Sequence, residues 1–337
     1  MTKIALFGAL LTLTACVGTE PDATIGPASE PDAPTASGPA EPTPAPATSA
    51  PSTQEEKPAP SATTGCDLDA PFQTPERIEA LRSQYYEVFP RLSADELTIY
   101  FAREDAYGGP IPRRIFIAKR ASITAPWNTP EVLTNINDGT NADTDPALSP
   151  DELSLTFASS RPGTGLQDMW IATRPNKLSN FSAPTQITGL NTTATDRSPV
   201  IIRDGAELWF SSSRPNGVGN TDIWRATKNG SSYDPPVLVT ELSSTGTENA
   251  ITLSNDGLTA YIGSSRAGGK GGEDIYVAKR ASVSDAFSTP VAVTELNTDA
   301  SQAPGFISKD GCRLYYHSSD FAAADYDLWV ATKPAKK

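Results

Sequence analysis

Hydrophobic and polar positions alternate along most of this chain in short runs bounded by Gly, Pro, Asn or Asp. Residues 146–190 show the pattern: "PALS", a turn, "LSLTFAS", a Gly-rich loop, "DMWIATR" and "PTQITGL". Alternation with a period of two predicts half-buried strands, and the turn residues between the runs predict antiparallel connections. This stretch therefore predicts four short antiparallel strands and no helix.

The four-strand unit occurs five times between residues 71 and 333. An aromatic residue followed three positions later by Pro marks each unit, with steps of 55, 54, 52 and 54 residues: Phe72/Pro75, Trp127/Pro130, Phe181/Pro184, Tyr233/Pro236 and Phe287/Pro290. An Asp that opens a turn follows in each unit: Asp95, Asp151, Asp204, Asp256 and Asp310. Repeated four-stranded antiparallel units without helices are typical of propeller blades. We predict an all-β, five-bladed β-propeller of four-stranded antiparallel blades.

The core of each unit, as in "LSPDELSLTFASSRP", resembles the TolB-type, WD40-like propeller repeat. That repeat reads Ser-Pro-Asp-Gly, a hydrophobic strand and then Ser-x-Arg. The resemblance covers residues 71–333 and is closest in the second, third and fourth units. It implies the propeller fold and a scaffold role, although propellers support many unrelated functions.

The phase of the repeat predicts how the ring closes. The repeated part starts with a fourth strand, "PERIEAL" at 75–81, and ends after a third strand, "DLWVATK". The N-terminal strand is therefore expected to complete the last blade. Cys66 and Cys312 fall in two loops on one face of that blade, so we predict a disulfide, which would stabilise the fold by roughly 3 to 5 kcal/mol.

The first 65 residues lack this pattern. Residues 1–15 contain Lys3, an apolar stretch too short to span a bilayer comfortably, and Leu13-Thr14-Ala15 before Cys16, as in a secretory signal. Cysteine at the cleavage point resembles the bacterial lipobox, which implies a lipid on Cys16. Val17 rather than Asp after it implies the outer membrane, facing the periplasm or the cell surface. Positions 17–65 hold eleven Pro and no aromatic residue, so 16–65 should be a disordered tether before the propeller at 66–337.

Charge and composition restrict the partners. Without the signal, 26 Lys and Arg stand against 40 Asp and Glu, a net charge of 26 − 40 = −14. Nucleic acid is therefore not expected as a partner, and we expect a monomer attached to the membrane through its lipid. The single histidine, His317, excludes a His-based zinc site or a Ser-His pair, and should cap the end of a strand. No cofactor or metal is predicted, although Ca²⁺ held by oxygen ligands stays open.

Charged residues recur around the loop between the second and third strands. An Arg is followed seven or eight residues later by an Asp, as Arg161/Asp168, Arg214/Asp222 and Arg266/Asp274. The first unit exchanges the signs, with Asp105 and Arg114. We predict a structural ion pair, or clamp, across this loop, beside an aromatic residue that packs between blades: Phe116, Trp170, Trp224, Tyr276 or Trp329. A ligand pocket repeated in every blade is the alternative.

The last unit departs from this rule. It has Asp320 and Asp327 at the two positions, with Asp325 between them, so no clamp is expected there. Either the terminal blade has decayed or a function has been added to it.

A second aligned position lies eight residues before each turn Asp. It holds Glu87, Asp143, Asp196, Glu248 and Gln302. These ring residues should converge near one mouth of the central channel, where they either bond to the arginines or attract a cation, an amine-rich peptide or a sugar. With Asp105, Asp320 and Asp325 they make up the candidate binding face.

Two functions fit the sequence. The first is a non-enzymatic, lipid-anchored envelope propeller that binds a protein or glycan partner through its loop face, with no catalytic residue. The second is a glycan-active enzyme, because five-bladed propellers include glycosidases with carboxylates around the central cavity. Two carboxyl groups about 5 to 9.5 Å apart in an open cleft would favour the enzyme. Pairing of every ring acid with Arg would exclude catalysis by the ring.

Overall fold

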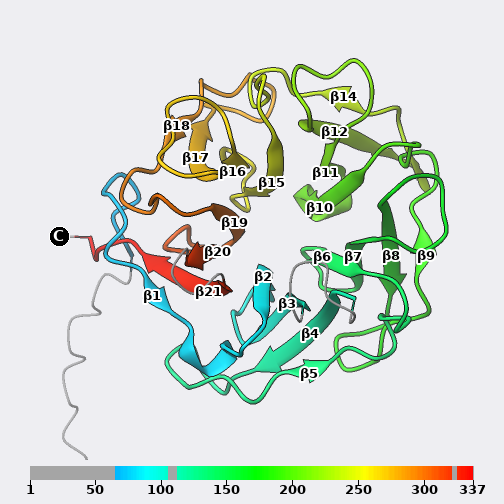
Figure 1. Ribbon diagram of the computed structural model, residues 1–337, viewed down its shortest axis with the longest axis horizontal. Coiled ribbons are helices and arrows are strands. Elements are labelled where there is room, and N and C mark those ends of the chain that lie inside the picture. The colour runs from blue at the N-terminus through cyan, green and yellow to red at the C-terminus, as the bar shows by residue number, and fades with distance from the viewer. Residues whose placement is uncertain (1–64, 105–111, 321–324, 337) are drawn as a thin grey trace, which may run out of the picture. The chain divides into compact units, whose positions relative to one another are not determined.

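The computed structural model describes residues 65–104, 112–320 and 325–336. They form five antiparallel sheets arranged as a ring about a central axis (Figure 1). The prediction of an all-β, five-bladed propeller is confirmed. No helix in these ranges is long and apolar enough to cross a membrane. Cys16, the signal and the tether lie outside the described residues.

The first strand of each blade lies nearest the axis and contacts the first strands of its neighbours. Blade one comprises β2 (Tyr86–Leu92), β3 (Thr98–Glu104), β4 (Arg114–Lys119) and β5 (Glu131–Val132). Blade two comprises β6 (Asp143–Leu148), β7 (Ser154–Ser159), β8 (Asp168–Thr173) and β9 (Thr185–Gln186). Blade three comprises β10 (Asp196–Ile202), β11 (Glu207–Ser212), β12 (Asp222–Asn229) and β14 (Val237–Leu238), with β13 (Ser232–Tyr233) also paired to β12.

The last two blades follow the same order. Blade four comprises β15 (Glu248–Leu253), β16 (Thr259–Ser264), β17 (Asp274–Lys279) and β18 (Val291–Ala292). Blade five comprises β19 (Gln302–Ile307), β20 (Arg313–Asp320), β21 (Asp325–Thr332) and β1 (Glu76–Arg77). Two short 3-10 helices complete the described elements, η1 (Glu79–Leu81) and η2 (Arg203–Gly205).

The turn Asp of the repeat fixes the connection between the first two strands. In blade two, Asp151 accepts hydrogen bonds from the Ser149 hydroxyl (2.5 Å) and the Leu153 amide (3.0 Å). The same two bonds form around Asp95, Asp256 and Asp310. In blade three the turn is η2 instead, and Asp204 has a φ of 53°. We call the end of the ring with these turns the turn face, and the opposite end the loop face.

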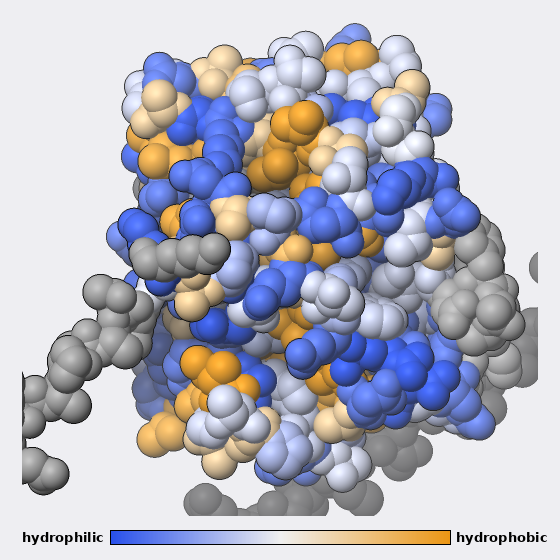
Figure 2. All heavy atoms as spheres, turned by 90° about the vertical axis from the view of Figure 1, so that its left-hand side faces the viewer, coloured by the Kyte–Doolittle hydropathy of each residue, from blue (hydrophilic) through white to orange (hydrophobic). Residues whose placement is uncertain are grey.

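The ring closes between the two ends of the repeated part. Strand β1 pairs with β21, where Glu76 lies opposite Val330 and Arg77 opposite Trp329. Cys66 and Cys312 form a disulfide whose Cα atoms are 5.7 Å apart. Both predictions about closure are therefore confirmed. Figure 2 views this side of the ring, where hydrophilic residues predominate and hydrophobic residues form small separate groups.

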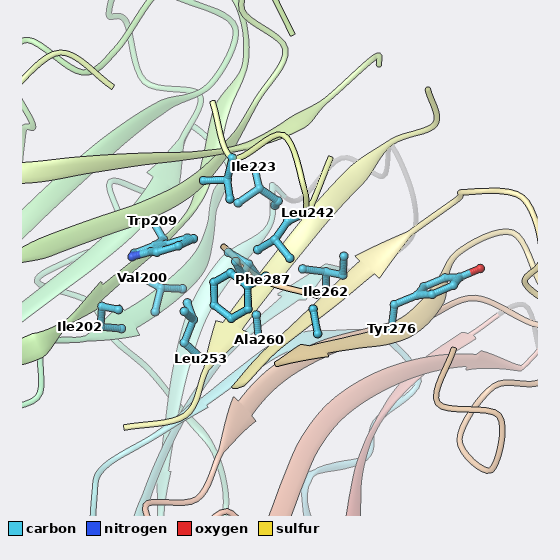
Figure 3. Packing of buried hydrophobic residues seen from close by; sticks show 13 residues of the cluster. Val200, Ile202, Trp209, Ile223, Leu242, Leu253, Ala260, Ile262, Tyr276 and Phe287 are labelled. Atoms are coloured by element: carbon cyan, nitrogen blue, oxygen red, sulfur yellow. The ribbon is translucent and has the colours of Figure 1, made fainter. Parts of the chain in front are cut away.

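The hydrophobic core lies between the blades. Five clusters of described residues each join two neighbouring blades, so the clusters follow one another around the ring. In the cluster between blades three and four, Val200 and Trp209 pack with Leu253, Ile262 and Phe287 (Figure 3). Burial of such side chains contributes most of the favourable free energy of folding.

The aromatic residue of the aromatic/Pro motif belongs to these clusters. In four of the five blades its ring lies under a cationic side chain that follows a third strand, as with Arg280, whose guanidinium is 4.4 Å from the Phe287 ring centroid. The equivalent pairs are Arg120/Trp127, Arg174/Phe181 and Lys333/Phe72. The motif therefore has a structural role at the turn face.

Candidate functional site

The five ring residues lie at the start of the innermost strands. Each is buried, with 0% of Glu87, Asp143, Asp196 and Glu248 exposed and 1% of Gln302. A backbone amide of the preceding connection donates a hydrogen bond to each side chain, from Ser83, Asp138, Thr192, Ser244 and Thr298. These five side chains are therefore not exposed as part of a binding face, because the connections fold over them. Of the two predicted alternatives, the four acids have the bond to an arginine.

Each acidic ring residue pairs with an arginine of its own blade. The nitrogen–oxygen distances are 2.7 Å for Arg103–Glu87, 2.9 Å for Arg161–Asp143, 2.7 Å for Arg214–Asp196 and 3.3 Å for Arg266–Glu248. The same guanidinium groups donate to carbonyl oxygens of the connections, at Leu81, Ile136, Leu190 and Leu242. Burial raises the pKa of Glu87 and Asp143 above their usual values, and hydrogen bonds from serine and arginine oppose the rise. Each pair therefore fastens one connection to its blade.

Gln302 of blade five shows the same position without an arginine. Its side-chain amide donates to the hydroxyls of Thr298 (2.7 Å) and Ser318 (3.2 Å). Without an arginine, a carboxylate at this position would be a buried unpaired charge, which is costly. The neutral amide of Gln302 avoids that cost.

The predicted clamp between each Arg and the following Asp is wrong. Asp168, Asp222 and Asp274 accept hydrogen bonds from backbone amides of the loop before them. In blade three these bonds run from Val218 (3.0 Å) and Gly219 (3.1 Å) to Asp222 Oδ2. The loop backbone thus satisfies the Asp, so the arginine turns to the ring acid and stacks on the aromatic residue of the third strand, as Arg214 does on Trp224 at 5.1 Å.

Two glycines in each loop make this arrangement possible. A Cβ on Gly217 would lie 2.0 Å from Asp222 Oδ2, and one on Gly219 would lie 2.3 Å from the carbonyl oxygens of Gly246 and Ser244. The first glycine therefore admits the carboxylate, and the second lets the loop contact the next blade. Equivalent glycines are Gly163 and Gly165 in blade two, and Gly269 and Gly271 in blade four. We call this Gly-x-Gly loop with its Asp the loop frame.

Blade one pairs its charges by another route. Arg103, directly opposite Glu87 in the strand register, takes the place of the arginine found two positions later in the other blades. Arg114 starts β4 with its guanidinium 5.8 Å from the Phe116 ring. Asp105 lies outside the described residues, so the exchanged pair Asp105–Arg114 stays a prediction.

Blade five is completed by arginines from the N-terminal segment. Asp327 lies 3.2 Å from Arg77 and 3.4 Å from Arg82, so its charge is balanced from outside the repeat unit and not across its own loop. Burial and the neighbouring Asp327 raise the pKa of Asp325, which is 9% exposed. Asp320 ends β20 opposite Asp325 in the register.

A group of charged residues lies on the axis itself and was not predicted from the sequence. Asp145 accepts from Arg197 (3.2 Å) and from the Ser198 amide (3.3 Å), and Arg197 lies 5.2 Å from the Phe89 ring. Phe89, Asp145 and Ser198 have φ values of 55°, 53° and 51° at bulges in β2, β6 and β10. The signal in the sequence was a proline directly after each of them, in register in three blades. Left-handed backbone of this kind is strained and often marks a functional site.

Two titratable groups border the axial group, the partly buried Glu273 and the buried His317. Burial raises the pKa of Glu273 to about 7, against the attraction of Arg197 and a hydrogen bond from Asn249. Burial also lowers the pKa of His317 to about 3, helped by Arg113 and Arg197. His317 does not cap a strand as expected: it lies within β20, and its Nδ1 accepts from the Phe89 amide (3.3 Å), which joins blade five to blade one.

The arrangement limits the chemistry of the loop face. The four acidic ring residues are buried, and each is paired with an arginine. Among the described residues, no group of three or more His, Cys, Asp or Glu side chains is placed to hold a metal ion.

Comparison with known proteins gives the fold and little more. No family model matches the sequence, and no curated protein matches it. The endo-arabinase from Bacteroides thetaiotaomicron VPI-5482 is similar in structure, with 15% identity over 79% of this chain and 98% of that chain and a TM-score of 0.53. A thermostable family-43 glycoside hydrolase gives 12% identity over 74% and 90% of the two chains, with a TM-score of 0.51. At such identities the similarity shows the propeller fold alone.

TolB is also among the structural neighbours. TolB from Acinetobacter baumannii has 17% identity over 76% of this chain, with a TM-score of 0.42. This chain spans 57% of the length of that TolB. The similarity is too distant to support an argument about partners.

Proposed function

We propose that this chain is a non-enzymatic envelope protein whose propeller binds a protein or glycan partner through its loop face. The observation that supports this most is the loop frame. Three neighbouring blades build the same rigid loop, yet the residue between the two glycines differs: Thr164, Val218 and Lys270, all exposed. A constant frame with a variable exposed position is suited to recognition rather than to chemistry.

Apolar side chains at these loops add to the proposal. Leu166 is 76% exposed and Val218 44% exposed, and both lie at the loop face. An exposed apolar residue on a backbone that is already ordered loses little entropy on binding, so it can act as an anchor for a partner.

Three features support the proposed location. The disulfide Cys66–Cys312 favours an oxidising compartment. The lipobox-like sequence before Cys16 and the Pro-rich tether suit a propeller held to the outer membrane by lipid. If so, replacing Cys16 by Ala should move the protein from the membrane fraction to the soluble fraction.

Hydrolysis of a glycan is the second candidate, and one observation favours it. Glu273, whose pKa burial raises to about 7, lies near the buried Asp145. Carboxyl groups in unlike environments are what acid and base catalysis require. The four acidic ring residues cannot serve, because each is paired with an arginine.

A photo-crosslinker at Val218 tests the proposal in intact cells. The matched control places the crosslinker at Leu178, which is 99% exposed in the loop after β8 at the turn face. We expect a defined adduct, identified by mass spectrometry, from Val218 and none from Leu178. Equal labelling from both positions would contradict a specific loop-face site. Turnover of arabinan by the native chain, lost in Glu273→Gln, would instead establish the enzyme.

A further inference from the structure

A cavity of about 110 Å³ lies on the axis at the turn face, opposite the loop frames. It is lined by the second halves of the innermost strands and by the turns that follow them. Its walls are largely aliphatic or aromatic, as with Leu148, Ile202, Leu253 and Phe306. Exposed Ala94 and Asn255 stand at its mouth. The cavity is thus open to a small ligand from the turn face.

Four charged residues line this cavity. Glu152, Arg203 and Lys309 belong to the turns, whereas Arg91 enters from an innermost strand. Arg91, on β2, is 6% exposed, and its guanidinium spans the axis to donate to the Ile251 carbonyl on β15 (2.9 Å). Its Nε is buried and has no hydrogen-bond partner. A buried donor without an acceptor is costly, so this group is available to a ligand.

The charge of Arg91 is also poorly balanced. Within the described parts of the chain, no carboxylate forms an ion pair with it. Asp145, which acts on its pKa, is already paired with Arg197 at 3.2 Å, and Glu152 in the cavity lining is paired with Lys177 at 3.1 Å. Burial lowers the pKa of Arg91 only to about 10, so the guanidinium stays charged at neutral pH. An anion in the cavity would supply the missing partner.

We propose that this cavity binds a small carboxylate with a short apolar group. The carboxylate contacts the Arg91 guanidinium, and the apolar group lies against the aliphatic walls. An apolar cavity of about 150 Å³ admits benzene, so the volume here suits roughly four to six carbon atoms. The site is separate from the loop-face partner site and does not depend on it.

Calorimetric titration of the full chain with hexanoate, hexanamide and inorganic phosphate tests the ligand chemistry. We expect hexanoate to bind at least about tenfold more tightly than either control, because only hexanoate has both a carboxylate and an apolar tail. Acetyl-Gly-Gly-Leu with a free C-terminus distinguishes the source: tighter binding of this peptide than of hexanoate would assign the same chemistry to a chain end. Equal binding of hexanoate and hexanamide, or no binding of hexanoate at about 10 mM, would overturn the proposal.

Variants then test the location. Arg91→Met should weaken hexanoate by about tenfold or more, whereas Arg91→Lys should keep most of the affinity. Asn255→Trp should block the mouth, and Asn220→Trp, at an exposed asparagine of the loop face, is the matched control. If Arg91→Met does not fold, the comparison of Asn255→Trp with Asn220→Trp still tests whether hexanoate binds in the cavity. Unchanged binding in Asn255→Trp would place hexanoate elsewhere and refute the site.

Discussion

At the scale of single residues, the repeated arginines and carboxylates are explained by the hydrogen bonds that join them. Alignment of the units gave the correct positions. It predicted a clamp between each Arg and the Asp seven or eight residues later, and gave a bond between the ring acids and the arginines as one of two alternatives. The structure joins each Arg to the ring acid 18 residues earlier, as in Arg214–Asp196. Sequence distance could not decide this, because the choice depends on backbone amides in a glycine loop, which an alignment does not show.

Replacing one partner of the Arg214–Asp196 pair should lower the free energy of unfolding much more than replacing both partners. Arg214→Met leaves Asp196 buried without its cation and is expected to lower the free energy of unfolding by about 3 to 5 kcal/mol. Adding Asp196→Asn should recover much of that loss, since Gln302 shows that a neutral amide is tolerated at this position. Urea unfolding followed by tryptophan fluorescence measures both. A double variant no more stable than Arg214→Met would contradict the pairing.

Glu273 should make stability depend on pH. Its pKa rises from 4.5 to about 7 on folding, so between these values the folded chain holds a proton that the unfolded chain has released. The native protein therefore loses stability as the pH rises through this window. The Glu273→Gln variant does not, because glutamine does not titrate. The variant should gain about 2 to 3 kcal/mol relative to the native protein between about pH 5 and pH 8. Urea unfolding at the two pH values measures this, and a difference independent of pH would disprove it.

At the scale of elements, the hydrophobic alternation in the sequence predicted the strands but not the conformation of the loops. The alternating runs predicted the strands of "LSLTFAS" and "DMWIATR", because one face of each packs against a neighbouring blade. The bulges in the innermost strands were missed, since residues before proline normally avoid a positive φ such as that of Asp145. Contacts across the axis hold these residues in place, and no local pattern encodes such contacts.

The loop frame makes a sharp prediction about its second glycine. Gly219→Ala would bring a Cβ to 2.3 Å from the Gly246 carbonyl oxygen. The backbone of two blades would have to separate, so we expect a loss of about 1 to 3 kcal/mol in the free energy of unfolding. Val218→Ala, an exposed neighbour, should change it by less than about 0.5 kcal/mol. Thermal unfolding of the two variants gives the comparison, and similar values for both would show that the frame is not rigid.

At the scale of the whole molecule, the phase of the repeat was enough to predict closure. The first strand had no second or third strand before it, and the last blade had no fourth, so β1 could only complete β21. The contribution of Arg77 and Arg82 to the last blade was not foreseen, because the alignment compared positions within units and these arginines precede the first complete unit. The axial cavity was likewise invisible, since all five blades form it.

Removing the disulfide should show how much it contributes to the stability of the closed ring. Replacing Cys66 and Cys312 together by Ser opens a covalent loop of 246 residues and should lower the free energy of unfolding by about 3 to 5 kcal/mol. Denaturant titrations with and without reductant measure the loss. The native protein should respond to reductant and the double variant should not. A native protein as stable when reduced as when oxidised would mean that the strand pairing alone seals the ring.

The pairing of β1 with β21 also determines when the ring can close during synthesis. Strand β1 is synthesised before every other strand of the ring, so it must wait for the last strand before it finds its partner, more than two hundred residues later. Until then the growing chain has separate blades with unsealed edges, and a chain that stops early cannot form a ring at all. Folding to completion therefore follows synthesis of the last blade, and ring closure distinguishes finished chains from truncated ones.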